Sequence, residues 1–372
     1  MSNKSINIIV RTKKILTDNR VKKEVRSLRD MGFKVCLIVS SNDISSSIDL
    51  GQDDLIKIPS FGKVDSRFNV VRYLSILWFS FFCILNVLFR SKVRRANHFW
   101  ICDPVLIIPC LFTSRFLNGL TVWDHHELAP EYLVRNSILK RAYKFVYKGV
   151  SSVVHANEER AQYTQSLLQF NHPNVVIIPN YFSKADLGSL KKVRSLGFIE
   201  PGYVYLQNTA NDSRCGFEIF RALKSRGVKA IHAGAVDNDL YERLKAELDV
   251  DNFCVFVGYL DIGEINWVLT NAAYTLIFYR NISPNNWLCD PNRLYHAAAL
   301  GVPVCVGNNP TMAELVKKNG LGIICDTDGS DSQAIEKGIK KMKQAAHRIQ
   351  VNGDIWAWEN LNDPIKKALG ML

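Results

Sequence analysis

Short runs of apolar, mostly β-branched or aromatic residues recur along the whole chain, and they constrain its fold more than any other feature. Each run is continuously apolar rather than alternating, and helix-like stretches separate the runs. That pattern is typical of parallel strands whose two faces are both covered by helices. The sequence therefore predicts an α/β fold built from doubly wound, Rossmann-like sheets. The predicted strands are "INIIV", "KVCLIVS", "LIKIP", "HFWIC", "LTVWD", "SSVVHA", "VVIIP", "YVYLQ", "KAIHAG", "FCVFVG", "YTLIFY", "VPVCVG" and "GIICD".

The length of 372 residues suits two domains of ordinary size. A polar stretch, "SKADLGSLKKVRSLGFIEPG", interrupts the rhythm of strands near the middle. We expect an N-terminal domain over 1–182, a linker over 183–202, a second domain over 203–352, and a C-terminal helix within 353–372 that packs back on the first domain. Ligands of open parallel sheets bind beyond the carboxyl ends of the strands, so we expect the two domains to face each other across a ligand cleft.

The composition of the chain indicates which kinds of partner it can bind. The formal net charge of +12 and the pI near 9.2 favour anions such as phosphorylated substrates or acidic membrane surfaces. Nucleic acid is disfavoured, because the basic residues are spread through the predicted elements rather than massed with aromatic residues. The nine cysteines occur singly, which indicates reduced thiols in a cytosolic protein. The N-terminus has no signal-peptide pattern, so we expect a cytoplasmic location.

Two common nucleotide-binding motifs are missing from the sequence. It contains neither Gly-x-Gly-x-x-Gly nor a Gly-Lys-Ser/Thr phosphate loop. These gaps disfavour a nicotinamide-dependent dehydrogenase and a P-loop ATPase. We expect no bound cofactor.

The segment 67–90, "RFNVVRYLSILWFSFFCILNVLFR", is the most apolar part of the chain. Its apolar run barely reaches the roughly 20 residues that cross a bilayer. At about 100° per residue, its polar side chains share one face of a helix, namely Asn69, Arg72, Ser75, Ser80, Asn86 and Arg90. Two interpretations stay open: the helix is buried in its domain, or its apolar side lies in a membrane interface. In the second case 67–95, which includes the basic "RSKVRR", contacts an anionic membrane surface.

Two motifs of the first half end predicted strands with polar residues. In "ILTDNRVKKEVRSLRD", Asp18 or Asn19 can cap a helix whose N–H groups point to the ligand edge, where Arg20 adds positive charge. We therefore place Asn19 and Arg20 in the cleft of the first domain.

In "LTVWDHHELAPE" a strand ends in Asp124, His125, His126 and Glu127. Histidine can relay protons near neutral pH. Neighbouring side chains on a strand point to opposite sides, so at most one of the two histidines faces the ligand. A metal site is one alternative, but consecutive positions lack the spacing that gathers ligands on a helix, and we expect no metal. A purely structural role at the end of the strand is the other alternative.

A third motif, "FYRNISPNNWLCDPNRLYHAAALGVPVCVGNNPT", combines hydroxyl-binding and phosphate-binding groups. Arg280 and Arg293 offer bidentate donors to phosphate. The helix that begins behind "GNNPT" adds unpaired N–H groups that suit an anion. Hydrogen-bonding partners for sugar hydroxyls come from Asn285, Asn286, Asp290 and Asn292.

Taken together, these motifs resemble the family-four nucleotide-sugar glycosyltransferases of the two-Rossmann, GT-B type. The resemblance rests on "DNRVKKEVRSLRDMGFKV", "VWDHHELAPE", "VVHANEERAQY", "VVIIPN" and "PNRLYHAAALGVPV…MAEL…GLGIICD", in the same order and spacing across nearly the whole chain. It implies that His126 approaches the transferred sugar, with Asp124 and Glu127 beside it. It also implies that Arg214 in "NDSRCGFEIF" holds the donor diphosphate. The full predicted donor site comprises Asn208, Arg214, Arg280, Asp290, Asn292, Arg293, His296, Thr311 and Glu314.

The chain departs from this family at three donor positions. Asn208 stands where a basic residue is usual, and His296 stands where a ribose-binding glutamate is expected. Leu288 occupies the position of the earlier glutamate of that pair. These changes imply either a different nucleotide sugar or a loss of activity.

The resemblance implies a metal-independent, retaining glycosyltransferase that acts without a cofactor. Arg214, Arg293 and helix N-termini would stabilise the departing phosphate. The expected acceptor is a hydroxyl of a glycan or lipid-linked precursor of a surface polysaccharide, at the cytoplasmic face of the membrane. Two other functions stay open: a nucleotide-sugar epimerase and a noncatalytic binding or scaffold protein of the same fold.

Overall fold

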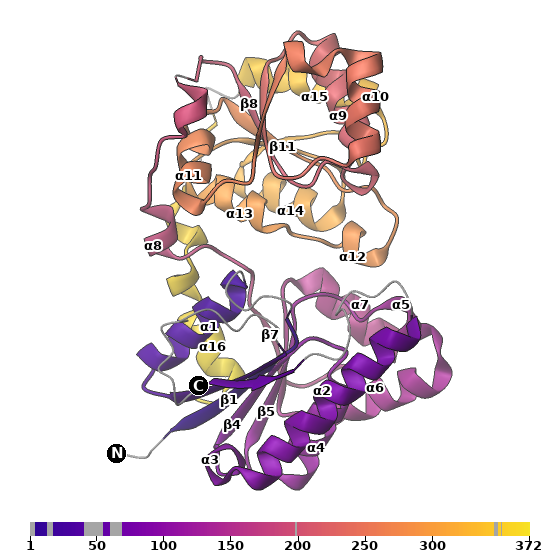
Figure 1. Cartoon of the computed structure of the whole chain (residues 1–372), viewed down its shortest axis with the longest axis vertical. Helices are drawn as coiled ribbons and strands as arrows, with labels where there is room; N and C mark the ends of the chain where they lie inside the picture. The colour runs from indigo at the N-terminus through magenta and orange to yellow at the C-terminus, as the bar shows by residue number, and fades with distance from the viewer. Residues whose placement is uncertain are drawn as a thin grey trace. The chain divides into compact units, whose positions relative to one another are not determined.

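The computed structural model describes residues 4–12, 18–40, 55–59, 69–197, 199–345, 349–350 and 352–372 (Figure 1). The chain forms two compact units. Unit 1 comprises Met1–Pro179 and Leu361–Leu372, and unit 2 comprises Asn180–Asn360. The segment 183–202, expected as a linker, therefore belongs to unit 2, as does the first part of 353–372.

Unit 1 is built on a parallel sheet in the order β3-β2-β1-β4-β5-β6-β7. The order reverses direction between β1 and β4, and this is the switch point at which doubly wound sheets bind ligands. Every strand predicted in this half is present. The strands are β1 (Ser5–Val10), β2 (Lys34–Ser40), β3 (Leu55–Ile58), β4 (His98–Cys102), β5 (Leu120–His125), β6 (Ser152–His155) and β7 (Val175–Ile177).

Helices cover both faces of this sheet (Figure 1). The long α2 and the helices α4 and α6 bury apolar residues against one face. The C-terminal α16 packs beside β6 and β7, where the Ser152 hydroxyl donates to the carbonyl of Ala368 at 2.6 Å. The helices of unit 1 are α1 (Asn19–Asp30), α2 (Asn69–Phe89), α3 (Ser91–Arg94), α4 (Ile107–Phe116), α5 (Glu131–Arg135), α6 (Ser137–Gly149), α7 (Glu158–Leu168) and α16 (Asn362–Ala368).

Unit 2 repeats the same winding with a parallel sheet in the order β10-β9-β8-β11-β12-β13. Its switch point lies between β8 and β11. The prediction of two Rossmann-like sheets is therefore confirmed. The strands are β8 (Val204–Gln207), β9 (Ala230–Ala233), β10 (Cys254–Gly258), β11 (Tyr274–Ile277), β12 (Val304–Val306) and β13 (Gly322–Ile324).

The helices of unit 2 divide between the two faces of its sheet. Helices α9, α10 and α15 pack on one face, and α11, α13 and α14 pack on the other. Asn266 on α11 is fully buried, and its amide donates to the carbonyls of Asp186 and Ser189, each at 2.7 Å. These bonds attach part of the segment expected as a linker to unit 2. The helices are α8 (Lys184–Leu187), α9 (Gly216–Ser225), α10 (Asn238–Leu248), α11 (Ile262–Asn271), α12 (Pro284–Trp287), α13 (Asn292–Ala299), α14 (Pro310–Asn319) and α15 (Ser332–Ala345).

Helix α2 turns its polar stripe inward. Ser75 and Ser80 are buried, and the Ser75 hydroxyl accepts a hydrogen bond from Arg11 at 3.2 Å. Small hydroxyl side chains let the helix approach the sheet closely, so the larger apolar residues of its other face point away from the core. Among the described residues, Val71–Phe89 is the one stretch long and apolar enough to cross a membrane, and a third of it is buried.

Candidate functional site

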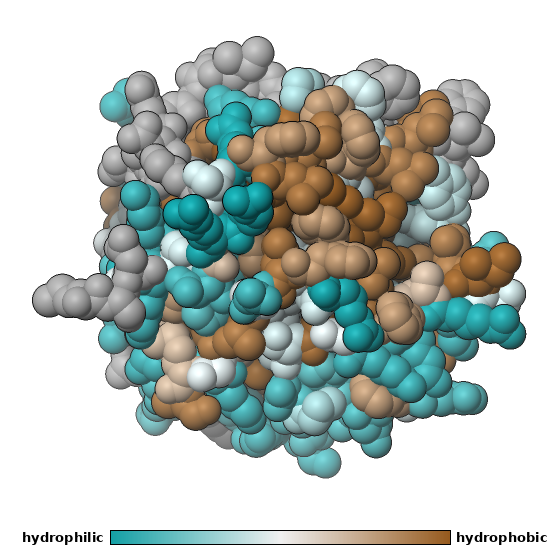
Figure 2. Space-filling model, turned by 90° about the horizontal axis from the view of Figure 1, so that it is seen from below, coloured by the Kyte–Doolittle hydropathy of each residue, from teal (hydrophilic) through white to brown (hydrophobic). Residues whose placement is uncertain are grey.

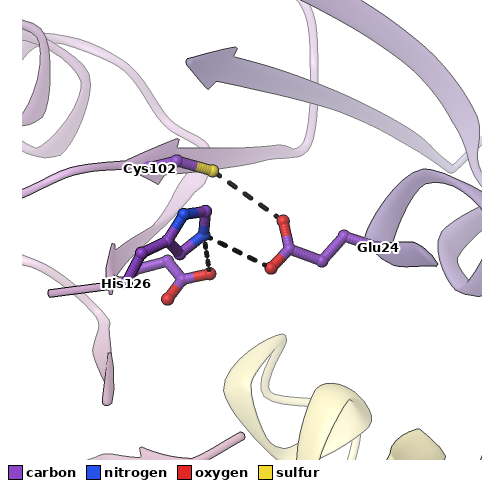
Figure 3. Close-up of side chains that lie close together, drawn as sticks. Glu24, Cys102 and His126 are labelled. Carbon is purple, nitrogen blue, oxygen red and sulfur yellow. Dashed lines mark hydrogen bonds and ion pairs between the residues drawn. The ribbon is translucent and has the colours of Figure 1, made fainter. Parts of the chain in front are cut away.

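Four side chains of unit 1 meet where β4 and β5 end (Figure 3). His126 follows β5, and its Nε2 lies 3.0 Å from Asp124 Oδ2 and 3.5 Å from Glu24 Oε1. Cys102 ends β4, and its Sγ lies 3.8 Å from Glu24 Oε2. Glu24 comes from α1, the helix that follows β1. The cluster therefore lies at the switch point between β1 and β4, where this fold class binds ligands.

Arg20 ties the two carboxylates of the cluster together. Its guanidinium donates to Glu24 Oε1 at 3.0 Å and to the two oxygens of Asp124 at 3.1 and 3.3 Å. The sequence led us to expect Arg20 as a positive charge open to an anion. That expectation needs correction, because Arg20 is only 5% exposed and its charge is compensated inside the cluster. Asn19 is exposed in the first turn of α1, and Asp18 is the residue that caps the helix.

Burial and charge set the protonation states. Burial alone would raise the pKa of Asp124, but the charges of Arg20 and His126 hold it well below its ordinary value. Burial alone would lower the pKa of His126, but the Asp124 carboxylate raises it well above its ordinary value. The imidazole is therefore positively charged at neutral pH. For Glu24, burial and the nearby Asp124 charge raise the pKa to about 7, against the influence of His126 and Arg20. Glu24 is the group of this cluster that gains and loses its proton near neutral pH.

His126 is the member of the cluster that reaches the surface. Its side chain is 22% exposed, whereas Glu24 and Asp124 are buried. A charged imidazole held by buried carboxylates can donate a proton or a hydrogen bond to a reacting oxygen. Glu127 is exposed, and its predicted catalytic role stays a prediction.

His125 points the other way, as adjacent positions on a strand require. It is 1% exposed and packs among buried aromatic side chains, with its Nδ1 3.3 Å from the hydroxyl of Tyr143. Burial lowers its pKa well below the ordinary value, so it stays neutral. Of the two adjacent histidines, His126 alone is available to a ligand of unit 1.

The cluster has the composition of a metal site. The ligand atoms of Glu24, Cys102, Asp124 and His126 all lie within 4.8 Å of one another. However, Arg20 already compensates both carboxylates, and burial with the nearby Glu24 raises the pKa of the Cys102 thiol. A thiol must lose its proton to bind a metal, so this arrangement favours a hydrogen-bonded network. Metal independence stays a prediction.

In unit 2, two predicted phosphate-binding arginines share one aromatic ring. The guanidinium carbons of Arg214 and Arg293 lie 3.8 and 4.9 Å from the ring centroid of Tyr279. Arg214 ends a short turn after β8, and Tyr279 follows β11, so the group lies at the switch point of the second sheet. Arg214 is half-buried. Arg293 is more enclosed, donates to the carbonyl of Gln207 at 2.8 Å, and has a pKa lowered by burial to about 10.

The N-terminus of α14 adjoins this group. Asn309, which precedes α14, donates to the carbonyl of Tyr279 at 3.0 Å, and its side chain does not cap the helix. The side-chain oxygens of Asn308, Asn309 and Thr311 are buried and have no partner among the described residues. Buried polar atoms without a partner are rare and costly. We call the region formed by Arg214, Tyr279, Arg293 and the N-terminus of α14 the corner. It suits a polar ligand that accepts hydrogen bonds from the helix N–H groups and donates hydrogen bonds to these oxygens.

The structure corrects two of the predicted donor-binding residues. His296 is 0% exposed, stacks on Phe182 at 4.0 Å, and hydrogen-bonds Asn266 at 2.5 Å. Burial lowers its pKa to about 4, so it is a neutral core residue of unit 2 and not a ligand contact. Asp290 is buried as well and accepts a hydrogen bond from the Tyr295 hydroxyl at 2.5 Å.

The other predicted donor residues of unit 2 differ in their exposure and contacts. Asn208 follows β8, and its side-chain oxygen lies 3.1 Å from Nε2 of His232. Arg280 pairs with Glu218 at 2.7 Å. Asn292 is exposed at the start of α13, and Glu314 is exposed within α14. The structure leaves their donor-binding role a prediction.

No known protein-family model matches the chain, and none of the curated proteins matches it.

Solved structures do match. Sucrose-phosphate synthase from Thermosynechococcus elongatus aligns with a TM-score of 0.73 at 14% identity, over 99% of this chain and 97% of that one. HepE from Anabaena, in complex with UDP, aligns with a TM-score of 0.71 at 13% identity, over 99% and 100% of the two chains. A putative UDP-N-acetylglucosamine 2-epimerase from Listeria monocytogenes aligns with a TM-score of 0.64 at 11% identity, over 99% and 97%. At these identities the similarity establishes the fold, which is the GT-B fold of two Rossmann-like domains; it does not single out family four.

Proposed function

We propose that this protein transfers a sugar from a nucleotide-sugar donor to a hydroxyl of a glycan or lipid-linked acceptor in surface polysaccharide biosynthesis, with retention of configuration. The observation that carries the proposal is the group formed by Arg214, Tyr279 and Arg293 beside the N-terminus of α14. It combines guanidinium groups, a helix N-terminus that Asn309 does not cap, and side-chain oxygens that have no partner among the described residues. HepE, which has the same fold, binds UDP and UDP-glucose, and this supports a nucleotide sugar as the donor.

The groups of this corner of unit 2, and His126 of unit 1, each have a role in the proposed reaction. The diphosphate accepts hydrogen bonds from Arg214 and from the first N–H groups of α14. These donors stabilise the negative charge that develops on the diphosphate as the bond to the sugar breaks. Arg293 is fixed by backbone carbonyls, so it supports the ring of Tyr279 and adds positive charge behind it. The charged imidazole of His126 donates a hydrogen bond to the transferred sugar as the bond between sugar and diphosphate breaks.

An epimerase is the second candidate, and Glu24 favours it specifically. Epimerisation requires a proton to be moved at the sugar ring. Glu24 is buried, so its carboxyl, with a pKa of about 7, would exchange a proton with the ring through the partly exposed His126, whose Nε2 lies 3.5 Å away. Incubation with the nucleotide sugar alone separates the two functions. An epimerase converts the sugar without an acceptor, whereas a glycosyltransferase leaves the donor intact until an acceptor hydroxyl is supplied.

Calorimetry with UDP, GDP, ADP, CMP and dTDP sugars tests the donor site. Replacement of Arg214 by Ala should weaken donor binding by about 1.5–3 kcal/mol, roughly 10- to 150-fold, because a charge-assisted contact is lost. Arg221→Ala is a matched control, since Arg221 also lies over an aromatic ring of unit 2, that of Phe217 at 4.9 Å, but is exposed on α9. Equal affinity in Arg214→Ala and wild type would contradict the proposed donor site. Absence of binding to every nucleotide sugar would instead favour a scaffold protein.

A further inference from the structure

The outer face of α2 carries a stripe of large apolar side chains. Phe81 is 56% exposed and Phe89 is 81% exposed. The exposed positions recur every three or four residues, so they line one side of the helix. They are Leu74, Leu77, Trp78, Phe81, Leu88 and Phe89.

Neighbouring helices extend this stripe into a broad surface. Helix α4 packs against both α2 and α6. We call the whole surface the apolar patch; to the stripe of α2 it adds Ile108 and Phe116 from α4 and Ile138 and Phe145 from α6. Figure 2 shows hydrophobic residues gathered over one continuous area on this side of unit 1. Apolar areas of this kind on a protein surface mark binding sites for a protein or a membrane.

The charge around the apolar patch distinguishes a protein partner from a membrane. Helices α2, α3, α4 and α6 contain no Asp or Glu, and neither does the connection between α2 and α3. Arg115 lies over the ring of Phe145 at 4.8 Å, which places a positive charge within the patch itself. A second copy of the chain would bring like charges together, whereas an anionic surface complements them. The basic residues of these helices and that connection are Arg72, Arg90, Lys92, Arg94, Arg115, Lys140, Arg141, Lys144 and Lys148.

The inner face of α2 excludes a simple transmembrane role. Phe79, Cys83 and Val87 are each 1% exposed and belong to the apolar core against the sheet. To span a bilayer, the helix would have to leave this core. It can instead stay in place and insert its outer side chains.

We propose that the apolar patch docks flat on an anionic lipid bilayer. Helix α2 lies in the plane of the interface, its outer side chains enter the boundary between headgroups and acyl chains, and the surrounding basic side chains bind acidic headgroups. This inference extends the proposed function: the idea that a lipid-linked acceptor is presented at the membrane surface rests on that function. Membrane binding itself is measured without donor or acceptor.

Co-sedimentation tests the proposal. The wild-type chain is mixed with vesicles of phosphatidylcholine alone or of phosphatidylcholine with phosphatidylglycerol, at low and high salt. We expect at least tenfold more binding to the anionic vesicles at low salt, and loss of that preference at high salt, because each basic residue near the surface contributes about fivefold. Phe81→Glu and Phe89→Glu should each reduce the partitioning at least tenfold. Leu190→Glu is the control, since Leu190 is 65% exposed on unit 2 and should leave partitioning unchanged.

Three results would overturn the inference. These are equal binding to neutral and anionic vesicles, no binding to either, and a stable dimer in ultracentrifugation that Phe81→Glu dissociates. Circular dichroism of each variant verifies that it is folded. A chain that binds anionic vesicles but no nucleotide sugar would refute the proposed function alone, and the opposite result would refute this inference alone.

Discussion

Replacing Glu24 by Gln should change how the stability of unit 1 depends on pH. The pKa of Glu24 is raised from 4.5 to about 7 by burial and by Asp124. Between these two values the unfolded chain has lost the proton and the folded chain retains it. Stability therefore falls as pH rises through this window, and the loss is complete above pH 7. The variant carries no ionisable group at position 24 and is free of this loss.

The size of the effect follows from the shift. A displacement of the pKa from 4.5 to about 7 corresponds to roughly 3 kcal/mol of unfolding free energy. Glu24→Gln should therefore gain roughly 3 kcal/mol relative to wild type between pH 4.5 and pH 8. Gln keeps the shape of the side chain and an oxygen that can accept from Arg20, so packing changes little.

Urea denaturation at several pH values, read by pulsed hydrogen exchange, measures this difference. Peptides that cover β4 and β5 report the unfolding of unit 1 without interference from unit 2. Glu158→Gln is the control, because Glu158 is exposed at the start of α7 and its variant should follow the wild-type curve. If wild type and Glu24→Gln gave parallel curves of unfolding free energy against pH, our account of the buried cluster would be refuted.

Further substitutions and metal removal test the rest of the structure. His126→Ala should lower turnover by roughly 10²- to 10⁴-fold with little change in nucleotide affinity, the usual effect of removing a positioned proton or hydrogen-bond donor. His125→Ala should instead lower the melting temperature at unchanged turnover per folded molecule, and equal turnover in both variants would remove His126 from the site. Dialysis against EDTA should leave activity unchanged; a loss that a single divalent ion restores would show that the cluster binds metal. Asn266→Ala should destabilise unit 2 by about 3 kcal/mol in urea denaturation, since two part-buried carbonyls and the buried His296 lose their hydrogen-bond partner. The exposed Asn271→Ala on the same helix should cost less than about 1 kcal/mol, and similar costs would contradict the anchoring role of Asn266.

The strands were predictable because continuous apolar runs have few alternatives in a chain of this length. The runs "KVCLIVS" and "LTVWD" predicted parallel strands, and both form parallel strands in the structure. The orientation of α2 was not predictable in the same way. Its sequence shows a polar stripe containing Ser75 and Ser80, but the core-facing side depends on the neighbouring sheet. The side of α2 that faces the core is set by residues of the sheet, which lie elsewhere in the chain.

In the candidate site too, contacts between residues close in sequence could be predicted, and contacts between residues of separate elements could not. Asp124 and His126 are two positions apart at the end of one strand, so their contact could be expected from alternation. Glu24 and Cys102 reach the cluster from other elements, and the one local signal was the spacing of Glu24 from Arg20, one helical turn. His296 matched a family motif by position, but a motif does not show what packs opposite it. In the structure Phe182 and Asn266 fill that space.

The division of unit 1 into two chain segments affects its synthesis. Met1–Pro179 leaves the ribosome first, then all of unit 2, and only afterwards Leu361–Leu372. Helix α16 therefore cannot cover β6 and β7, nor can Ala368 accept from Ser152, until unit 2 has been translated. Until then the edge of the first sheet is without its covering helix. The last part of unit 1 is therefore added only after the whole of unit 2 has been translated.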